Sequence, residues 1–178
     1  MRVRHLHFLL LVVFTALALL AQEHPVSERA AQRIQKEVLH ELRMLPYVTV
    51  FDNLAFRVNG DKVTLLGQVT NPVVKSDAEK AVKGIEGVEQ VDNQIEVLPV
   101  SPMDNRLRIA LYRAIYGYPT LEKYALPVIK PIRIIVKNGH VTLEGVVDSQ
   151  TDKDIVGLRA NGVPGVFSVT NNLQVAKS

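Results

Sequence analysis

Apolar and polar residues alternate along this chain with two different periods, and the periods predict where helices and strands form. Over residues 31–45 the apolar side chains recur every three or four positions, which lines one face of a helix that Pro46 ends. Residues 54–58 and 63–69 alternate with period two instead, as strands do. The turn residues 59–62 lie between these two segments, which therefore predict a hairpin.

A second helix and a third strand complete this unit. Asn71 and Pro72 open the helix, apolar residues at helical spacing continue it to Ile85, and glycines end it. Residues 91–97 then return to a strand pattern. The predicted order of elements is αββαβ.

The same unit recurs 78 positions further along the chain. From the predicted hairpin to the last strand, the two copies align at this offset without a gap. The residues that recur are mostly glycines and strand-forming aliphatics, which fix turns and a core. The main identical pairs are Val58/Val136, Val63/Val141, Thr64/Thr142, Leu65/Leu143, Gly67/Gly145, Val69/Val147, Gly84/Gly162, Gly87/Gly165, Val91/Val169, Asn93/Asn171 and Val97/Val175. No constellation of acid, base and nucleophile recurs with them, so the repeat predicts a binding scaffold and not an enzyme.

The predicted fold is therefore α+β, with two tandem αββαβ modules over residues 27–99 and 104–177. In each module we expect a three-stranded sheet packed on one face by two helices. The connection Pro99-Val100-Ser101-Pro102 is short, so we expect the modules to pack on each other. The second copy also carries about five extra residues, within residues 120–131, between its first helix and its hairpin.

Gly67 and Gly145 lie inside predicted strands, where glycine lowers stability unless a bulge or a close neighbour requires the missing Cβ. We expect close packing of a helix on the sheet to be that reason. A ligand that approaches the backbone is the alternative.

The first 21 residues have the layout of a secretory signal peptide. Arg2 and Arg4 precede an apolar run from Phe8 to Ala21, which is shorter than the roughly 20 residues of a membrane-spanning helix. This length favours a cleaved leader, after Ala18 or Ala21, over an uncleaved anchor. We therefore predict an exported protein, periplasmic or secreted.

Composition removes several classes of function. The chain has no cysteine, which excludes disulfides, thiolate metal sites and a cysteine nucleophile. The remaining histidines, His24, His40 and His140, are too far apart to predict a metal site. Without the leader, 19 basic residues face 18 acidic ones, and this balance together with export argues against nucleic-acid binding.

The charge is divided unevenly between the two modules. Residues 31–99 hold 8 basic and 10 acidic side chains, whereas residues 104–178 hold 10 basic and 6 acidic ones. The first module thus has a net charge of −2 and the second a net charge of +4.

The sharpest candidate site is the outer side of the helix that begins near Leu107. If Leu107, Leu111 and Ile115 face the core, a 100° step per residue turns a set of aromatic and basic side chains outward. The predicted lipid- or partner-binding residues are Arg106, Arg108, Ile109, Tyr112, Arg113 and Tyr116. The alternative is that the apolar members of this set pack against the other module or against residues 120–131.

Two sequence motifs, each present twice, resemble a known family. They are V-x-L-x-G-x-V at residues 63–69 and 141–147, and G-V-x-x-V-x-N at residues 87–93 and 165–171. With the order αββαβ, they resemble the BON domain, named for bacterial osmotically inducible and nodulation proteins. The resemblance covers nearly all of the chain after the leader.

The resemblance implies a non-enzymatic envelope module that binds phospholipid or supports envelope integrity under osmotic stress, without a cofactor. The motif positions it shares are structural: Gly67, Gly145, Gly87, Gly165, Asn93 and Asn171. Two hypotheses follow. In the first, the basic second module associates with anionic phospholipid. In the second, the same surface or an exposed sheet edge docks an envelope protein.

Overall fold

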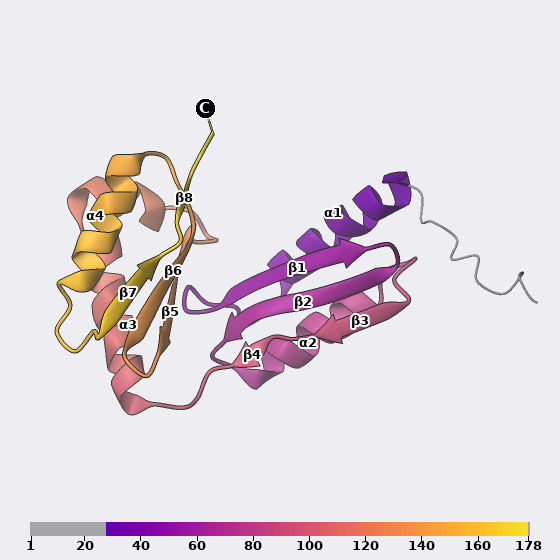
Figure 1. Cartoon of the computed structure of the whole chain (residues 1–178), viewed down its shortest axis with the longest axis horizontal. Helices are drawn as coiled ribbons and strands as arrows, with labels where there is room; N and C mark the ends of the chain where they lie inside the picture. Colours follow the sequence, from indigo (N-terminus) through magenta and orange to yellow (C-terminus); the bar gives the residue numbers. More distant parts are fainter. Residues whose placement is uncertain (1–27, 178) are drawn as a thin grey trace, which may run out of the picture.

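In the computed structural model, which describes residues 28–177, two similar α+β modules follow one another along the chain (Figure 1). Module 1 consists of α1 (Glu28–Met44), β1 (Asn53–Asn59), β2 (Lys62–Val69), α2 (Pro72–Lys83), β3 (Gln90–Asn93) and β4 (Glu96–Val97). Module 2 consists of α3 (Pro102–Tyr116), the 3-10 helix η1 (Pro119–Ala125), β5 (Ile132–Lys137), β6 (His140–Val147), α4 (Gln150–Asn161), β7 (Ser168–Asn171) and β8 (Gln174–Val175). The predicted leader lies outside the described residues.

The predicted α+β fold with two tandem modules is confirmed. In module 1 the central strand β2 is antiparallel to β1 and parallel to β3 and β4. Strand β6 has the same role in module 2, between β5 on one side and β7 and β8 on the other. Each β1–β2 or β5–β6 pair is a hairpin with a two-residue turn, Gly60-Asp61 or Asn138-Gly139.

The third strand differs from the prediction because an asparagine divides it into two short pieces in each module. The Asn93 side chain donates to the Lys75 carbonyl oxygen (2.9 Å) and accepts from the Ile95 backbone amide (3.2 Å). Asn171 makes the corresponding bonds to Lys153 and Leu173. The repeated asparagine therefore ties the second helix of each module to the break in its last strand.

Each module has its own aliphatic core, formed by the inner face of the sheet and the two helices. In module 1 the buried residues include Ile34, Val38 and Leu42 of α1, Val74, Ala78 and Val82 of α2, and Val63, Leu65 and Val69 of β2. In module 2 the core is larger because η1 adds Leu121 and Tyr124. Burial of this kind supplies about 25 cal/mol for each Å² of apolar surface removed from water.

The glycines inside the central strands are required by the neighbouring strand and not by a helix, contrary to our expectation. Gly67 has φ +113°, and a Cβ there would lie 2.0 Å from the Asn53 carbonyl oxygen of β1. Gly145 has φ +122°, and a Cβ there would lie 1.9 Å from the Pro131 carbonyl oxygen. Both glycines thus allow the backbones of a hairpin to approach closely where its first strand begins.

The motif glycines that follow α2 and α4 also have a conformational role. Gly87 and Gly165 have φ +86° and +92°, and they lie against Ile34 of α1 and Leu107 of α3, respectively. Side chains rarely adopt this backbone region, so the motif glycines fix the path from each second helix into the last strand.

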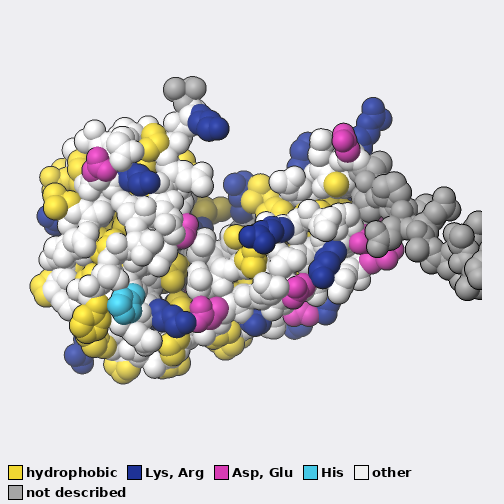
Figure 2. Space-filling view, in the orientation of Figure 1, with side chains coloured by type: hydrophobic (Ala, Val, Ile, Leu, Met, Phe, Trp, Pro, Cys, Tyr) yellow, Lys and Arg dark blue, Asp and Glu magenta, His cyan; other side chains and the backbone are white. Residues whose placement is uncertain are grey.

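The two modules touch through the loop between α1 and β1, which reaches the sheet of module 2 (Figure 1). The Ile134 amide of β5 donates to the Val50 carbonyl oxygen (2.9 Å), and the Arg133 guanidinium donates to the Thr49 carbonyl oxygen (2.9 Å). Lys137 of β5 pairs with Glu96 of β4, and Figure 2 shows charged side chains of both signs at this junction.

We predict that Gly145→Ala lowers the free energy of unfolding by about 2–4 kcal/mol, because the new Cβ overlaps the Pro131 carbonyl and the φ angle is unfavourable. Chemical denaturation followed by circular dichroism measures this. The matched control is Gly162→Ala, since Gly162 has φ −77° and only ordinary contacts, and it should change stability by less than about 1 kcal/mol. Equal effects of the two substitutions would contradict this explanation.

Candidate binding site

Tyr116, one of the residues predicted to face outward, is buried inside module 2. Its side chain is 4% exposed, and its hydroxyl donates to the Ile132 carbonyl oxygen (2.5 Å) and accepts from the Ile132 amide (3.2 Å). Burial raises the pKa of Tyr116 well above its ordinary value, so the neutral phenol is the form that the fold holds. The predicted exposure of Tyr116 is therefore wrong.

Arg108 is also buried, so its predicted role as an exposed lipid- or partner-binding residue is wrong as well. Its side chain is 4% exposed and donates to the Val136 carbonyl oxygen (2.7 Å) and to the Asn105 side chain (2.6 Å). Burial lowers the pKa of Arg108, while the nearby Asp104 carboxylate acts in the opposite direction. Arg108 thus holds strand β5 in place and is not available to a lipid phosphate.

Tyr112 is half-buried because the loop of module 1 covers it. Its ring centroid lies 6.4 Å from that of Phe51 in an edge-to-face arrangement, and 4.9 Å from that of Tyr116. The three rings fill the space between α3 and the loop before β1. The helical period placed Tyr112 and Tyr116 opposite the core stripe, but Tyr116 belongs to the buried core of module 2, because α3 also packs against the edge of β5.

The remaining predicted residues, Arg106, Ile109 and Arg113, are exposed, and Ile109 is 51% exposed. The exposed Met103 lies on the same side of α3, one turn before Arg106. Figure 1 shows α3 and α4 on the side of the module 2 sheet that faces away from module 1. This side of the module is open in the described structure.

A groove of about 550 Å³ between α3 and α4 adjoins these residues. It is lined by Ala110, Ala114, Tyr118, Ile155, Leu158, Arg159, Gly162, Val163 and Pro164. Leu158 is 72% exposed. We call Met103, Arg106, Ile109, Arg113, Leu158 and Arg159 the α3–α4 face.

Arg159 is held in position at the rim of this groove. Its Nε donates to the Ala114 carbonyl oxygen (3.1 Å), and its guanidinium carbon lies 4.9 Å from the centre of the Tyr118 ring. The side chain is still exposed, so its remaining N–H groups can reach a ligand. With Arg106 and Arg113 it gives the α3–α4 face three guanidinium groups.

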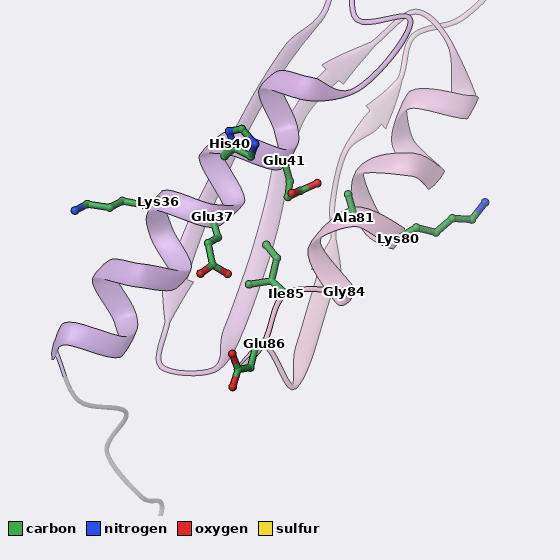
Figure 3. A pocket seen from close by; sticks show the side chains of 9 residues that line it. All are labelled: Lys36, Glu37, His40, Glu41, Lys80, Ala81, Gly84, Ile85 and Glu86. Atoms are coloured by element: carbon green, nitrogen blue, oxygen red, sulfur yellow. The ribbon is translucent and has the colours of Figure 1, made fainter.

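The equivalent groove of module 1 has a different chemistry. It lies between α1 and α2, has a volume of about 580 Å³, and is lined by Lys36, Glu37, His40, Glu41, Lys80, Ala81, Gly84, Ile85 and Glu86. Figure 3 shows three carboxylates around it, from Glu37, Glu41 and Glu86. None of the residues that line the groove of module 2 is acidic. The groove of module 1 is therefore mixed in charge, with three carboxylates and two lysines, whereas that of module 2 is apolar and basic.

Comparison with known proteins now identifies the fold. The family model of the BON domain matches residues 30–99 and 121–177. The chain belongs to the BON domain family. It is 30% identical, over 133 residues, to osmotically-inducible protein Y of Escherichia coli (strain K12). That match covers 68% of this chain and 61% of the relative, so the chain spans less than two thirds of the relative's length.

Two solved structures match this chain with low similarity. Both are structures of CdsD, a structural protein of the type III secretion system of Chlamydia trachomatis, and one of them is its C-terminal domain. Each is 13% identical, with TM-scores of 0.32 and 0.28. The matches cover 82% and 80% of this chain, and 94% and 96% of those chains.

The densest cluster of titratable side chains in this BON protein connects η1 to α4. The Lys123 ammonium lies 2.8 Å from Asp148 and 2.9 Å from Asp152, and the Tyr124 hydroxyl donates to Asp152 (2.8 Å). Burial acts to raise the pKa of Asp152, but the bonds from Lys123, Tyr124 and Ser149 outweigh it and lower that pKa. The members satisfy one another, so the cluster holds the inserted segment and offers no free acid or base.

Among residues 28–177, no group of three histidine, cysteine, aspartate or glutamate side chains is arranged to hold a metal ion. None of the helices in that range has the length and apolar character needed to cross a membrane.

Sequence reasoning missed Met103, Leu158 and Arg159, three of the six residues of the α3–α4 face. A signal for two of them was present in the duplication, because Leu158 and Arg159 stand 78 positions after Lys80 and Ala81 of the first copy. The copies therefore differ at a groove whose scaffold they share.

We predict that Tyr116→Phe lowers the free energy of unfolding by about 1–2 kcal/mol, since it leaves the buried amide and carbonyl of Ile132 without their partner. Thermal or chemical denaturation measures this. The control is Tyr112→Phe, because the Tyr112 hydroxyl bonds to none of the described residues, and it should change stability by less than about 0.5 kcal/mol.

Alkaline pH tests the same burial. Because burial raises the pKa of Tyr116 above the ordinary tyrosine value of about 10, its contribution to stability is fully present below about pH 10 and is lost as the pH rises further. The unfolding free energy of the wild type should therefore fall more steeply between pH 9 and 11 than that of Tyr116→Phe. Parallel curves would show that Tyr116 ionises as easily in the folded as in the unfolded chain.

Proposed function

We propose that this BON protein is a non-enzymatic envelope module that associates peripherally with anionic phospholipid through the α3–α4 face of module 2. One observation carries the proposal. The α3–α4 face combines Arg106, Arg113 and Arg159 with exposed Met103, Ile109 and Leu158, and no carboxylate lines its groove. A basic and apolar surface of this kind suits the boundary between lipid headgroups and acyl chains.

The physical basis is a sum of small contributions. Each basic side chain near an anionic surface contributes about 1 kcal/mol, and guanidinium forks pair well with phosphate oxygens. Shallow insertion of Ile109 or Leu158 removes apolar surface from water. Module 1 offers a weaker equivalent, because the carboxylates of Glu37, Glu41 and Glu86 offset the lysines that line its groove.

The similarity to a protein named as osmotically inducible supports a role in the bacterial envelope under osmotic stress. The predicted signal peptide is consistent with that location. In this role module 2 contacts the membrane. Module 1, which has a net negative charge and an exposed sheet edge, faces other components of the envelope. Of the six residues predicted from the sequence, Arg106, Ile109 and Arg113 belong to the α3–α4 face. Arg108, Tyr112 and Tyr116 do not.

The test is co-sedimentation of the exported protein with phosphatidylglycerol vesicles at low salt. Arg106→Glu combined with Arg113→Glu should reduce binding at least about tenfold, because four units of charge change where the protein meets the surface. Neither arginine side chain makes a hydrogen bond or ion pair with any described residue, so the fold should tolerate the change.

The matched control is Lys36→Glu combined with Arg57→Glu, which makes the same change of charge on module 1. Binding of this control should stay within about twofold of the wild type. Equal losses in both double variants would show that net charge alone, and not the α3–α4 face, governs the association. Absence of binding by the wild type would reject the function.

A further inference from the structure

The free edge of strand β1 in module 1 has unpaired backbone groups. Asn59 and Lys62 flank a two-residue turn and form a hydrogen-bonded pair. Because such pairs alternate along an antiparallel hairpin, Arg57 and Ala55 also exchange hydrogen bonds with β2. The residues between them direct their backbone amides and carbonyls away from β2. These edge residues are Leu54, Phe56 and Val58. None of residues 28–177 forms a hydrogen bond with their outward amides or carbonyls. An unpaired strand edge is a template for another strand.

The same edge in module 2 is closed. Strand β5 directs Ile132, Ile134 and Val136 outward, and their groups are bonded by Tyr116, Val50 and Arg108, respectively. Two of these partners are side chains of α3. The third is the carbonyl of Val50, which lies in a turn of module 1 closed by the bond from the Asp52 amide to the Thr49 carbonyl oxygen.

The side chains that close β5 have no counterparts on α1. The core residues Ile34, Val38 and Leu42 of α1 correspond to Leu107, Leu111 and Ile115 of α3, an offset of 73 positions. Arg108 then corresponds to Gln35, and Tyr116 corresponds to Arg43. Neither Gln35 nor Arg43 bonds to β1 or to any other described residue. The open edge thus results from specific replacements on one helix.

A groove of about 530 Å³ lies beside this edge, between the two modules, where Figure 2 shows the surface hollowed. Its apolar lining includes Leu39 and Leu42 of α1, Leu54 and Phe56 of β1, and Ile129 of module 2. The groove therefore offers pockets for apolar side chains directly next to the unpaired backbone groups.

The charge of this groove is positive. Arg43, Lys130 and Arg133 line it, against a single carboxylate, that of Asp52. Asp52 is 1% exposed and accepts four hydrogen bonds from the amides and hydroxyls of Thr49 and Thr70, so it is satisfied within the fold. A segment bound in this groove would therefore contact basic and apolar side chains.

We propose that the β1 edge of module 1 binds an extended segment of another protein that alternates apolar and acidic residues and adds a further strand beside β1. Backbone hydrogen bonds to Leu54, Phe56 and Val58 provide the register. Alternate apolar side chains enter the groove beside Leu54 and Phe56. The carboxylates on the other positions point to the opposite face of the sheet, on which Arg57 of β1 lies exposed. A second copy that paired through its own β1 would bring Arg57 and no carboxylate to this positive edge.

The test uses the exported protein and two fluorescein-labelled octapeptides, (Val-Glu)4 and (Val-Lys)4. Fluorescence anisotropy should show saturable binding of the glutamate peptide, and binding of the lysine peptide at least about tenfold weaker. A third peptide, (Val-Glu)4 with every backbone amide N-methylated, keeps the charge but cannot donate backbone hydrogen bonds. It should also bind at least about tenfold more weakly.

Hydrogen exchange measured by NMR locates the peptide. The amides of Leu54, Phe56 and Val58 should exchange faster than that of Ile134 in the free protein, and they should slow when (Val-Glu)4 is added. Unchanged exchange at β1 would overturn the proposal. Slowed exchange confined to module 2 would overturn it as well.

Protein variants separate the open edge from its charge. Gln35→Arg combined with Arg43→Tyr transfers the closing side chains of module 2 to α1 and should abolish peptide binding, while vesicle binding stays unchanged. Arg57→Ala tests the charge on the same strand, since Arg57 is exposed and its side chain forms no ion pair with a described residue. It should weaken binding of the glutamate peptide and leave binding of the lysine peptide no weaker.

The N-methylated peptide keeps the test decisive if the double variant folds poorly, because it requires no change to the protein. Equal binding of methylated and unmethylated peptides would mean that charge alone holds them, and would overturn strand addition. Concentration-dependent dimers that disappear in the double variant would show that a second copy occupies the edge, which also overturns the proposal.

Discussion

The backbone groups at the edges of two small sheets constrain this structure more than any single side-chain contact does. A three-stranded sheet with its second strand in the centre leaves its first strand half-unpaired, and buried amides and carbonyls need partners. In module 2 the partners come from Arg108 and Tyr116 of α3 and from Val50 of module 1. The burial of both α3 side chains and the position of module 1 follow from that need.

The fold was largely predictable because its signals are local. Period-two alternation and the turn residues located both hairpins, and the offset of 78 residues repeated the glycine and asparagine positions with them. Gly67 and Gly145 were recognised as unusual within strands. The reason for them was not predictable, because it depends on how closely the carbonyls of Asn53 and Pro131 approach across each hairpin.

The candidate site was only partly predictable. A helical period gives the angle of a side chain from the core stripe, and it correctly left Arg106, Ile109 and Arg113 exposed. It carries no information about a strand edge that lies beside the helix and takes up Arg108 and Tyr116. The contact from Val50 was also invisible in the sequence, since it is made by a backbone carbonyl that any residue could supply.

Sharing a closing segment between modules also constrains how this chain could have evolved. Val50 precedes β1 in module 1 but completes the sheet of module 2, so the second module is not self-sufficient in this respect. Module 2 released by a recombination event, or placed ahead of module 1 in a rearranged gene, would display the amide of Ile134 and the ring of Tyr112. The order of the two modules along the chain is therefore part of the structure of module 2.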